Sequence, residues 1–155
     1  MNTSLLKKNA LICGSTQGIG FAIAKELALL GANCILMARN ENSLQGALAD
    51  LDSTQGQRHS YLVADFSNNM HVKQTIVSYA KEHKVHILIN NTGGPPAGKI
   101  ADAVDADFVA ALNLHLINNH NITTALLEGM KSEGYGRIIN IVSTSVKVPL
   151  PNLGV

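Results

Sequence analysis

The sequence contains no tryptophan, and only three phenylalanines and three tyrosines occur among its 155 residues. A core built from this chain must therefore be mostly aliphatic, as expected where the strands of a sheet are covered on both faces. No apolar run reaches the roughly 18 residues that suggest a membrane-spanning helix. The opening residues 1–9 are polar and lack the apolar core of a signal peptide. We therefore expect a cytoplasmic protein with no membrane partner.

A strong charge of either sign is also missing, because 12 basic and 11 acidic residues give a formal net charge of +1. Such a chain has no field to attract nucleic acid. Cys13 and Cys34 both fall in apolar runs that predict neighbouring buried strands. A disulfide between them is conceivable, but a cytosolic chain favours two inert thiols. His115 and His120 are five residues apart, off a common helix face, and the other histidines show no ligand spacing, so we expect no metal site.

What the sequence does have is a glycine-rich turn within residues 10–20, with glycines at positions 14, 18 and 20. Residues 10–13 are too short and too uniformly apolar for an amphipathic helix and predict a buried strand, whereas residues 21–30 carry a helical period. A helix that begins at this turn directs free N–H groups and its positive dipole end toward it, which suits a phosphate or pyrophosphate. The alternative is that these glycines merely form a loop.

Four more short apolar runs follow, and helical patterns separate them. We predict strands at 34–38, 59–64, 85–89 and 138–142, and helices at 41–51, from Ser67 or Asn68 to 80, and at about 101–130. This alternation predicts one α/β domain over residues 1–155, a doubly wound parallel sheet. The apolar residues of the last helix, from Phe108 through Leu112, Leu116 and Ile117 to Leu126, are expected to lie against the sheet.

Two segments at predicted strand ends have side chains that suit a nucleotide. The second strand ends in Ala38-Arg39-Asn40, where an acid would hold a free ribose 2′-OH and a base would accept a 2′-phosphate, so Arg39 favours NADP(H) over NAD(H). A solvated Arg39, neutralised by Glu41, is the alternative. The fourth strand ends in two asparagines that can bridge neighbouring backbones, and Gly93 allows close approach to a ribose. The alternative there is a rigid Gly/Pro loop.

In this order the segments resemble the short-chain dehydrogenase/reductase family. The glycine turn follows the pattern G-x-x-x-G-x-G, residues 90–93 match the family's Asn-Asn-Ala-Gly with Thr92 for alanine, and residues 136–143 match Gly-Arg-Ile-x-Asn-Ile-x-Ser. The resemblance implies the strand order 3-2-1-4-5 and hydride transfer between NADP(H) and a small-molecule carbonyl or secondary alcohol. It also implies a homodimer or homotetramer, with 3-oxoacyl-(acyl-carrier-protein) reductases as a plausible subgroup.

The same resemblance implies a role for each site residue. The pyrophosphate side would be bound by Gly14, Ser15, Gln17, Gly18, Ile19 and Gly20. Arg39 would bind the 2′-phosphate, Asp65 and Phe66 the adenine, and Asn90 and Gly93 the ribose. Ser143 would be the catalytic serine, with Ser145 as a fallback donor and Asn113 in support. The alternatives are a helix-capping role near Asp65, an exposed polar residue at 113 and a strand-ending serine at 143.

The family's proton donor is a tyrosine followed four residues later by a lysine, and this chain contains no such pair. Tyr61, Tyr79 and Tyr135 are followed at that distance by Asp65, His83 and Ile139. We expect the pair to lie beyond Val155 in a longer domain, and we expect the 155 residues alone to be inactive. A dinucleotide-binding relative without turnover, a sensor or scaffold, is the alternative function.

Overall fold

The computed structural model describes residues 3–155 and has at its centre one five-stranded parallel sheet in the order β3-β2-β1-β4-β5. The strands are β1 (Asn9–Cys13), β2 (Asn33–Ala38), β3 (Ser60–Val63), β4 (Ile87–Asn90) and β5 (Arg137–Asn140). The predicted doubly wound fold and strand order are confirmed. Because the strand order reverses between β1 and β4, a crevice opens at their carboxyl ends, where such sheets bind ligands.

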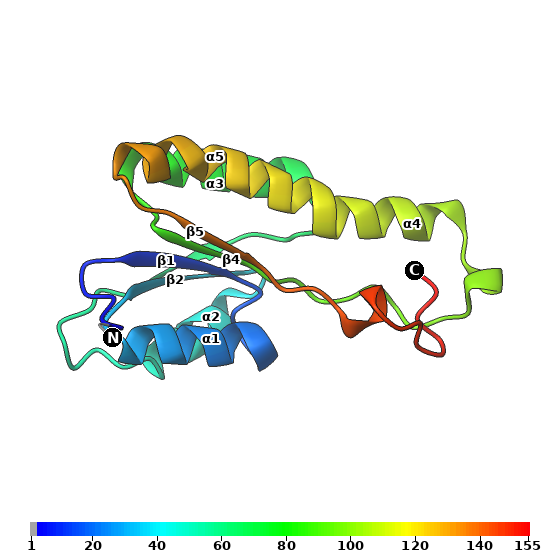
Figure 1. Ribbon diagram of the computed structural model, residues 1–155, viewed down its shortest axis with the longest axis horizontal. Helices are drawn as coiled ribbons and strands as arrows, with labels where there is room; N and C mark the ends of the chain where they lie inside the picture. Colours follow the sequence, from blue (N-terminus) through cyan, green and yellow to red (C-terminus); the bar gives the residue numbers. More distant parts are fainter. Residues whose placement is uncertain (1–2) are drawn as a thin grey trace.

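Helices cover both faces of the sheet, with α1 and α2 on one side and α3 and α5 on the other (Figure 1). The helices are α1 (Gly18–Leu29), α2 (Glu41–Ala49), α3 (Asn69–Glu82), α4 (Asp105–Leu112) and α5 (Asn118–Ser132). Two 3-10 turns, η1 (Ile100–Asp102) and η3 (Thr144–Val146), lie in the loops after β4 and β5. A π-helical turn, η2 (Asn113–Ile117), joins α4 to α5.

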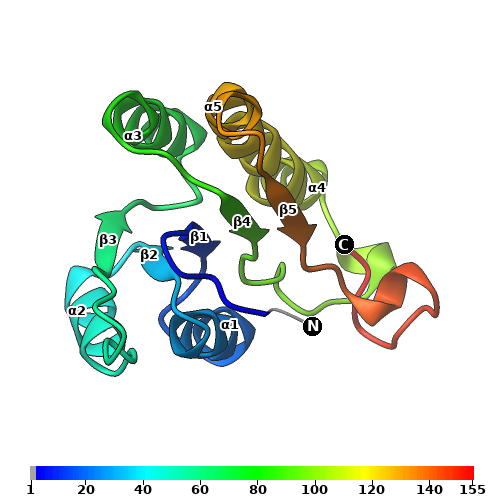
Figure 2. The same ribbon diagram turned by 60° about the vertical axis from the view of Figure 1, so that its left-hand side comes forward.

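Alternate residues of each strand build two separate cores because successive strand side chains point to opposite faces. In β1, Ala10 and Ile12 pack in the core beneath α1 and α2. Leu11 and Cys13 pack on the other face, in the core that α3 and α5 cover. Both clusters are aliphatic apart from a few aromatic side chains, as the composition predicts. Figure 2 shows the two helical layers with the sheet between them.

The prediction for the long helical region is wrong in its first half. Leu126 is buried against the sheet, but Phe108 is 40% exposed and Leu112 is 55% exposed. Leu116 and Ile117 are exposed as well. The reason is the length of the helical region, because α4 projects beyond the carboxyl edge of the sheet, where no strand lies beneath it (Figure 1).

The two thiols lie on neighbouring strands and both are free and buried, as expected. Burial raises the pKa of Cys13 and of Cys34 to about 12. Both thiols therefore stay protonated and unreactive at neutral pH. None of the helices between residues 3 and 155 is both long and apolar enough to cross a bilayer.

Candidate functional site

The glycine turn brings α1 close to the end of β1 and to the loop after β4. Gly14 has φ of +58°, and a side chain there would place its Cβ 2.6 Å from the Asn91 carbonyl oxygen. A Cβ at Gly20 would collide with the Gly14 carbonyl and would lie 2.8 Å from Asn91 Nδ2. Gly18 has φ of +56° with open space around it. The three glycines therefore permit a tight turn whose main chain is accessible to a ligand.

The remaining predicted residues of this turn differ in what they can offer a ligand. Ser15 is fully buried, and its hydroxyl oxygen accepts a hydrogen bond of 3.0 Å from the Met37 N–H, so any ligand contact would come from its main chain. Gln17 is the N-cap of α1 but makes no side-chain capping bond. Ile19 is 60% exposed. The first helical turn leaves N–H groups free, as the phosphate interpretation requires.

One cavity of about 420 Å³ lies beside this turn, at the carboxyl ends of β1, β2 and β3. Its lining includes the predicted residues Gly14, Arg39, Asp65, Phe66 and Gly93. Thr16 and Thr92 also line it, and sequence reasoning had not assigned either a role. The structure thus brings the predicted 2′-phosphate and adenine residues to one cavity.

Asp65 is held in place by the start of the next helix. Its carboxylate accepts a hydrogen bond of 2.9 Å from the Ser67 N–H. Hydrogen bonds from Ser67 lower the pKa of Asp65, and the positive charge of Arg39 acts in the same direction. Asn68 caps α3 by accepting from the His71 N–H at 3.0 Å. Asp65 is therefore ionised near neutral pH and lies near Arg39.

A second cavity, of about 490 Å³, adjoins the first at Thr92 and Gly94, which line both. Ser143 and Ser145 line it together with Ile19 and Asn90. The Ser143 oxygen accepts hydrogen bonds from the Ser145 hydroxyl at 2.6 Å and from the Ser145 N–H at 3.1 Å. With these two bonds accepted, the Ser143 hydroxyl hydrogen stays available to donate to a ligand.

The two asparagines at the end of β4 contact neighbouring strands, Asn91 through the backbone as predicted and Asn90 through a side chain. Asn90 Nδ2 donates to Asn140 Oδ1 on β5 at 2.8 Å. Asn91 Nδ2 lies 3.2 Å from the carbonyl oxygens of both Cys13 and Gly14. Asn90 is 1% exposed, and its Oδ1 has no hydrogen-bond partner among the residues described. Asn90 is in the lining of the second cavity, and its unpaired acceptor suits the hydroxyl of a bound ribose.

The helical region across the cavity departs from regular geometry at Asn113, which begins η2. Its carbonyl oxygen accepts from Asn69 Nδ2 at 2.8 Å, while its side chain lines neither cavity. Two residues later, His115 lines the second cavity and makes a hydrogen bond of 2.9 Å between its Nδ1 and Thr92 Oγ1. Sequence reasoning missed His115 because it considered the histidines only as metal ligands.

The two cavities share Thr92 and Gly94 in their linings and together provide a space along the carboxyl edge of the sheet that suits an extended dinucleotide. Arg39 places a cation in the lining of the smaller cavity, Asn90 with its unpaired Oδ1 lies in the lining of the larger one, and Gly18 in the turn has open space around it. Between residues 3 and 155, no three His, Cys, Asp or Glu side chains gather where they could share a metal ion.

Comparison with known proteins gives a consistent result. The family model described as short chain dehydrogenase matches residues 8–155. The chain is 34% identical to the human inactive hydroxysteroid dehydrogenase-like protein 1 in an alignment of 155 positions that covers 93% of this chain and 44% of the relative. It is 28% identical to a Chlamydia muridarum 3-oxoacyl-(acyl-carrier-protein) reductase over 144 residues, 92% of this chain and 58% of that one.

Among solved structures, the L-sorbose reductase of Gluconobacter frateurii, complexed with NADPH and L-sorbose, superposes with a TM-score of 0.88 at 30% identity. The match covers 97% of this chain and 57% of the reductase. The chain therefore spans about half the length of the relatives that it matches.

Proposed function

The chain belongs to the short-chain dehydrogenase family, and from this premise we propose that it binds a nicotinamide dinucleotide and serves hydride transfer between NADP(H) and a carbonyl or secondary alcohol. The observation that carries the proposal is the pair of adjoining cavities, which joins the glycine turn and Arg39 to Ser143 along one edge of the sheet. A similar structure that was solved with NADPH supports the choice of ligand.

In this proposal the main chain of residues 14–20 binds the pyrophosphate, Asp65 and Phe66 contact the adenine, and Asn90 and Gly93 contact the ribose. When bound, the nicotinamide supplies or accepts the hydride. Ser143 donates its hydroxyl hydrogen to the substrate carbonyl oxygen as negative charge develops there. Asn113 acts in support, because the backbone irregularity that it begins shapes the wall of the site. We further propose that the protein is a homodimer or homotetramer.

Arg39 is proposed to select NADP(H) through the 2′-phosphate. It lines the smaller cavity, β2 ends without an acid beside it, and Asn40 already accepts the Ser43 N–H as the cap of α2 at 2.9 Å. Glu41, two residues after Arg39, accepts a hydrogen bond of 2.8 Å from the Tyr61 hydroxyl, and Asp65 lines the same cavity as Arg39.

Fluorescence titration with NADPH and with NADH tests the binding step and the selection together. The wild type is expected to bind NADPH more tightly, and Arg39→Ala is expected to lose that preference by about 10-fold or more. Arg58→Ala is the matched control, because Arg58 is exposed just before β3, at the amino end of the strands, and is not among the lining residues of either cavity. Unchanged NADPH affinity in Arg39→Ala would make the Arg39 assignment wrong, and no binding of either nucleotide would refute the proposed function.

One observation favours a second candidate, a dinucleotide-binding protein without turnover. A relative at 34% identity is named inactive. Under this candidate NADPH binds but no carbonyl is reduced. Measured turnover by the 155-residue chain with any carbonyl would overturn it.

A further inference from the structure

His115 is a cavity-lining side chain that the proposed hydride transfer does not use. It lies in η2, between α4 and α5, and lines the larger cavity together with Ser143. Its Nδ1 is held by Thr92 Oγ1 at 2.9 Å. Its other ring nitrogen, Nε2, is buried and has no hydrogen-bond partner within residues 3–155. The ring is therefore fixed at one nitrogen and unsatisfied at the other.

An unsatisfied buried polar atom is unfavourable, so native proteins rarely keep one that nothing reaches. In the described part of the chain only two side-chain atoms are in this state, His115 Nε2 and Asn90 Oδ1. Both residues line the same cavity. A ribose hydroxyl of the proposed cofactor would satisfy Asn90 Oδ1. His115 Nε2 is therefore left for a second ligand.

The chemistry of the ring indicates which group it would contact. Burial lowers the pKa of His115, so the imidazole is neutral at physiological pH. The Thr92 hydroxyl can either donate to Nδ1 or accept from it, and Nε2 therefore presents either an N–H or a lone pair. A hydroxyl group has the same dual capacity and would be satisfied in either arrangement.

The rest of the cavity favours a neutral ligand. None of the lining side chains identified between residues 3 and 155 is Lys, Arg, Asp or Glu, and the walls include Ile19, Ile141 and Val142. An ionised substrate group would lose water there without gaining a counter-charge from these side chains, which is costly. A hydroxyl group would also lose water, but it would gain a hydrogen bond with His115 Nε2.

We propose that His115 Nε2 hydrogen-bonds a hydroxyl next to the reacting carbonyl, so that the site prefers neutral hydroxylated carbonyl compounds to simple ketones. His115 is then a specificity-determining residue, and Thr92 is a positioning residue that orients the ring. This inference rests on the proposed function, because Ser143 marks where the carbonyl would lie.

Two ketones of nearly equal size, hydroxyacetone and butanone, test the inference because they differ by a hydroxyl in place of a methyl group. With NADPH bound, each ketone is titrated while the nitrogen-15 resonance of His115 Nε2 and the affinity are followed by NMR. Hydroxyacetone is expected to shift that resonance and to bind more tightly, and butanone is expected to leave the resonance in place.

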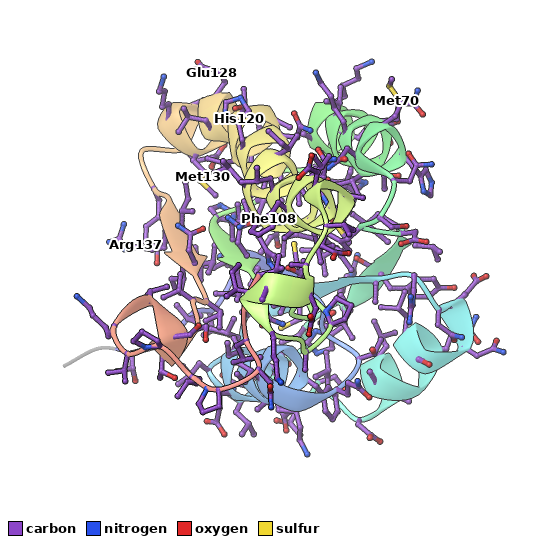
Figure 3. All side chains as sticks on the ribbon, turned by 90° about the vertical axis from the view of Figure 1, so that its right-hand side faces the viewer. Met70, Phe108, His120, Glu128, Met130 and Arg137 are labelled. Carbon is purple, nitrogen blue, oxygen red and sulfur yellow. The ribbon has the colours of Figure 1, made fainter. Side chains whose placement is uncertain are left out.

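Variants separate the contact from a general effect on folding. His115→Phe should reduce the preference for hydroxyacetone by about 10-fold with NADPH affinity unchanged. His120→Phe is the matched control, because His120 lies on the exposed side of α5, as labelled in Figure 3. Thr92→Val should reduce the preference, and Thr92→Ser should restore it.

The outcomes distinguish this inference from the proposed function. Equal behaviour of the two ketones, or a shift produced by NADPH alone, overturns the role of His115 even if NADPH binds. A hydroxyacetone-specific shift supports the contact whether or not the 155-residue chain turns over the ketone, whereas failure to bind NADPH refutes the proposed function and not the contact. If His115→Phe does not fold, the wild-type resonance alone decides.

Discussion

Ser143 is the residue whose replacement would say most about chemistry, because its hydroxyl hydrogen is free to donate after Ser145 occupies its oxygen. In a form of the protein that turns over a carbonyl, we expect Ser143→Ala to lower kcat by about 10²- to 10³-fold, since a donor to the developing oxyanion is lost. NADPH affinity should not change. Steady-state kinetics and fluorescence titration measure the two quantities, with Thr144→Val as the neighbouring control. An unchanged kcat would exclude Ser143 as the donor.

Gly20 is a residue at which the structure predicts a stability effect. Gly20→Ala places a methyl group against the Gly14 carbonyl and 2.8 Å from Asn91 Nδ2. We expect a loss of about 1–3 kcal/mol in the free energy of unfolding, as for other overpacked sites. Gly46→Ala, inside α2 with nothing within 4 Å of its Cβ, is expected to gain about 0.5–1 kcal/mol. Urea denaturation of the pair measures both, and equal stabilities would contradict the close approach of α1.

Some side-chain contacts of the site could be predicted from the sequence, and others could not. The backbone bridge expected of an asparagine at a strand end is present at Asn91. Asn90 instead bridges to a side chain, that of Asn140 on β5. The contact between Thr92 and His115 was not predictable, because the two residues are 23 positions apart and neither belongs to a repeating pattern. The one indication in the sequence was Thr92, which replaces the alanine of the family's Asn-Asn-Ala-Gly segment.

Among the elements, β1 and the start of β4 are joined by a histidine that must stay neutral. His86 Nδ1 accepts the Asn9 N–H at 3.0 Å, and the ring is 7% exposed. Burial, and then the positive charge of Lys8, hold the pKa of His86 below its ordinary value of 6.5. The unfolded chain therefore takes up this proton first as the pH falls. The stability that His86 contributes is present above about pH 6.5 and is lost on acidification toward its lower folded pKa.

We expect the free energy of unfolding to fall between pH 7 and pH 5, and to fall less in His86→Asn, whose amide oxygen can still accept from Asn9 but does not titrate. Urea unfolding at several pH values measures the difference. His120→Asn, at an exposed position on α5, is the control and should behave like the wild type. The same pH dependence in His86→Asn and wild type would show that another group is responsible.

The strands and most helices were predictable because short apolar runs alternate with helical periods, a pattern that buried parallel strands impose. Periodicity states which residues share a face but not what lies under that face. For this reason the apolar stripe of α5 was placed correctly at Leu126, and the stripe of α4 at Leu112 was not. Whether the sheet extends beneath α4 depends on the lengths of the strands relative to that helix. Hydrophobic periodicity does not state those lengths.

For the whole molecule, the exposed apolar side of α4 is relevant to the proposed oligomer. Val109 is 56% exposed and Leu112 is 55% exposed. Figure 3, which views the end of the molecule where α4 projects, shows Phe108 on the same helix. If copies of the chain pair through this side, glutamates there would be buried without partners, which is costly.

We expect Val109→Glu combined with Leu112→Glu to weaken self-association by at least about 10-fold. Sedimentation velocity over a range of concentrations measures it. Leu29→Glu, an equally exposed leucine at 53% at the end of α1, in the other helical layer, is the control and should leave association unchanged. A wild type that stays monomeric at high concentration would refute the proposed oligomer.

The π-helical turn η2 also has a consequence for variation in this long helical region. Its hydrogen bonds span five residues instead of four, so the five residues of η2 set the rotational phase between α4 and α5. Because this wider turn holds one residue more than an α-helical turn, deleting one residue within η2 would give a continuous α-helix in which α4 and α5 keep nearly their present facing. Deleting one residue inside α4 would instead rotate the part of α4 before it by about 100° relative to α5. A length change is therefore expected to alter the molecule less within η2 than in the helices beside it.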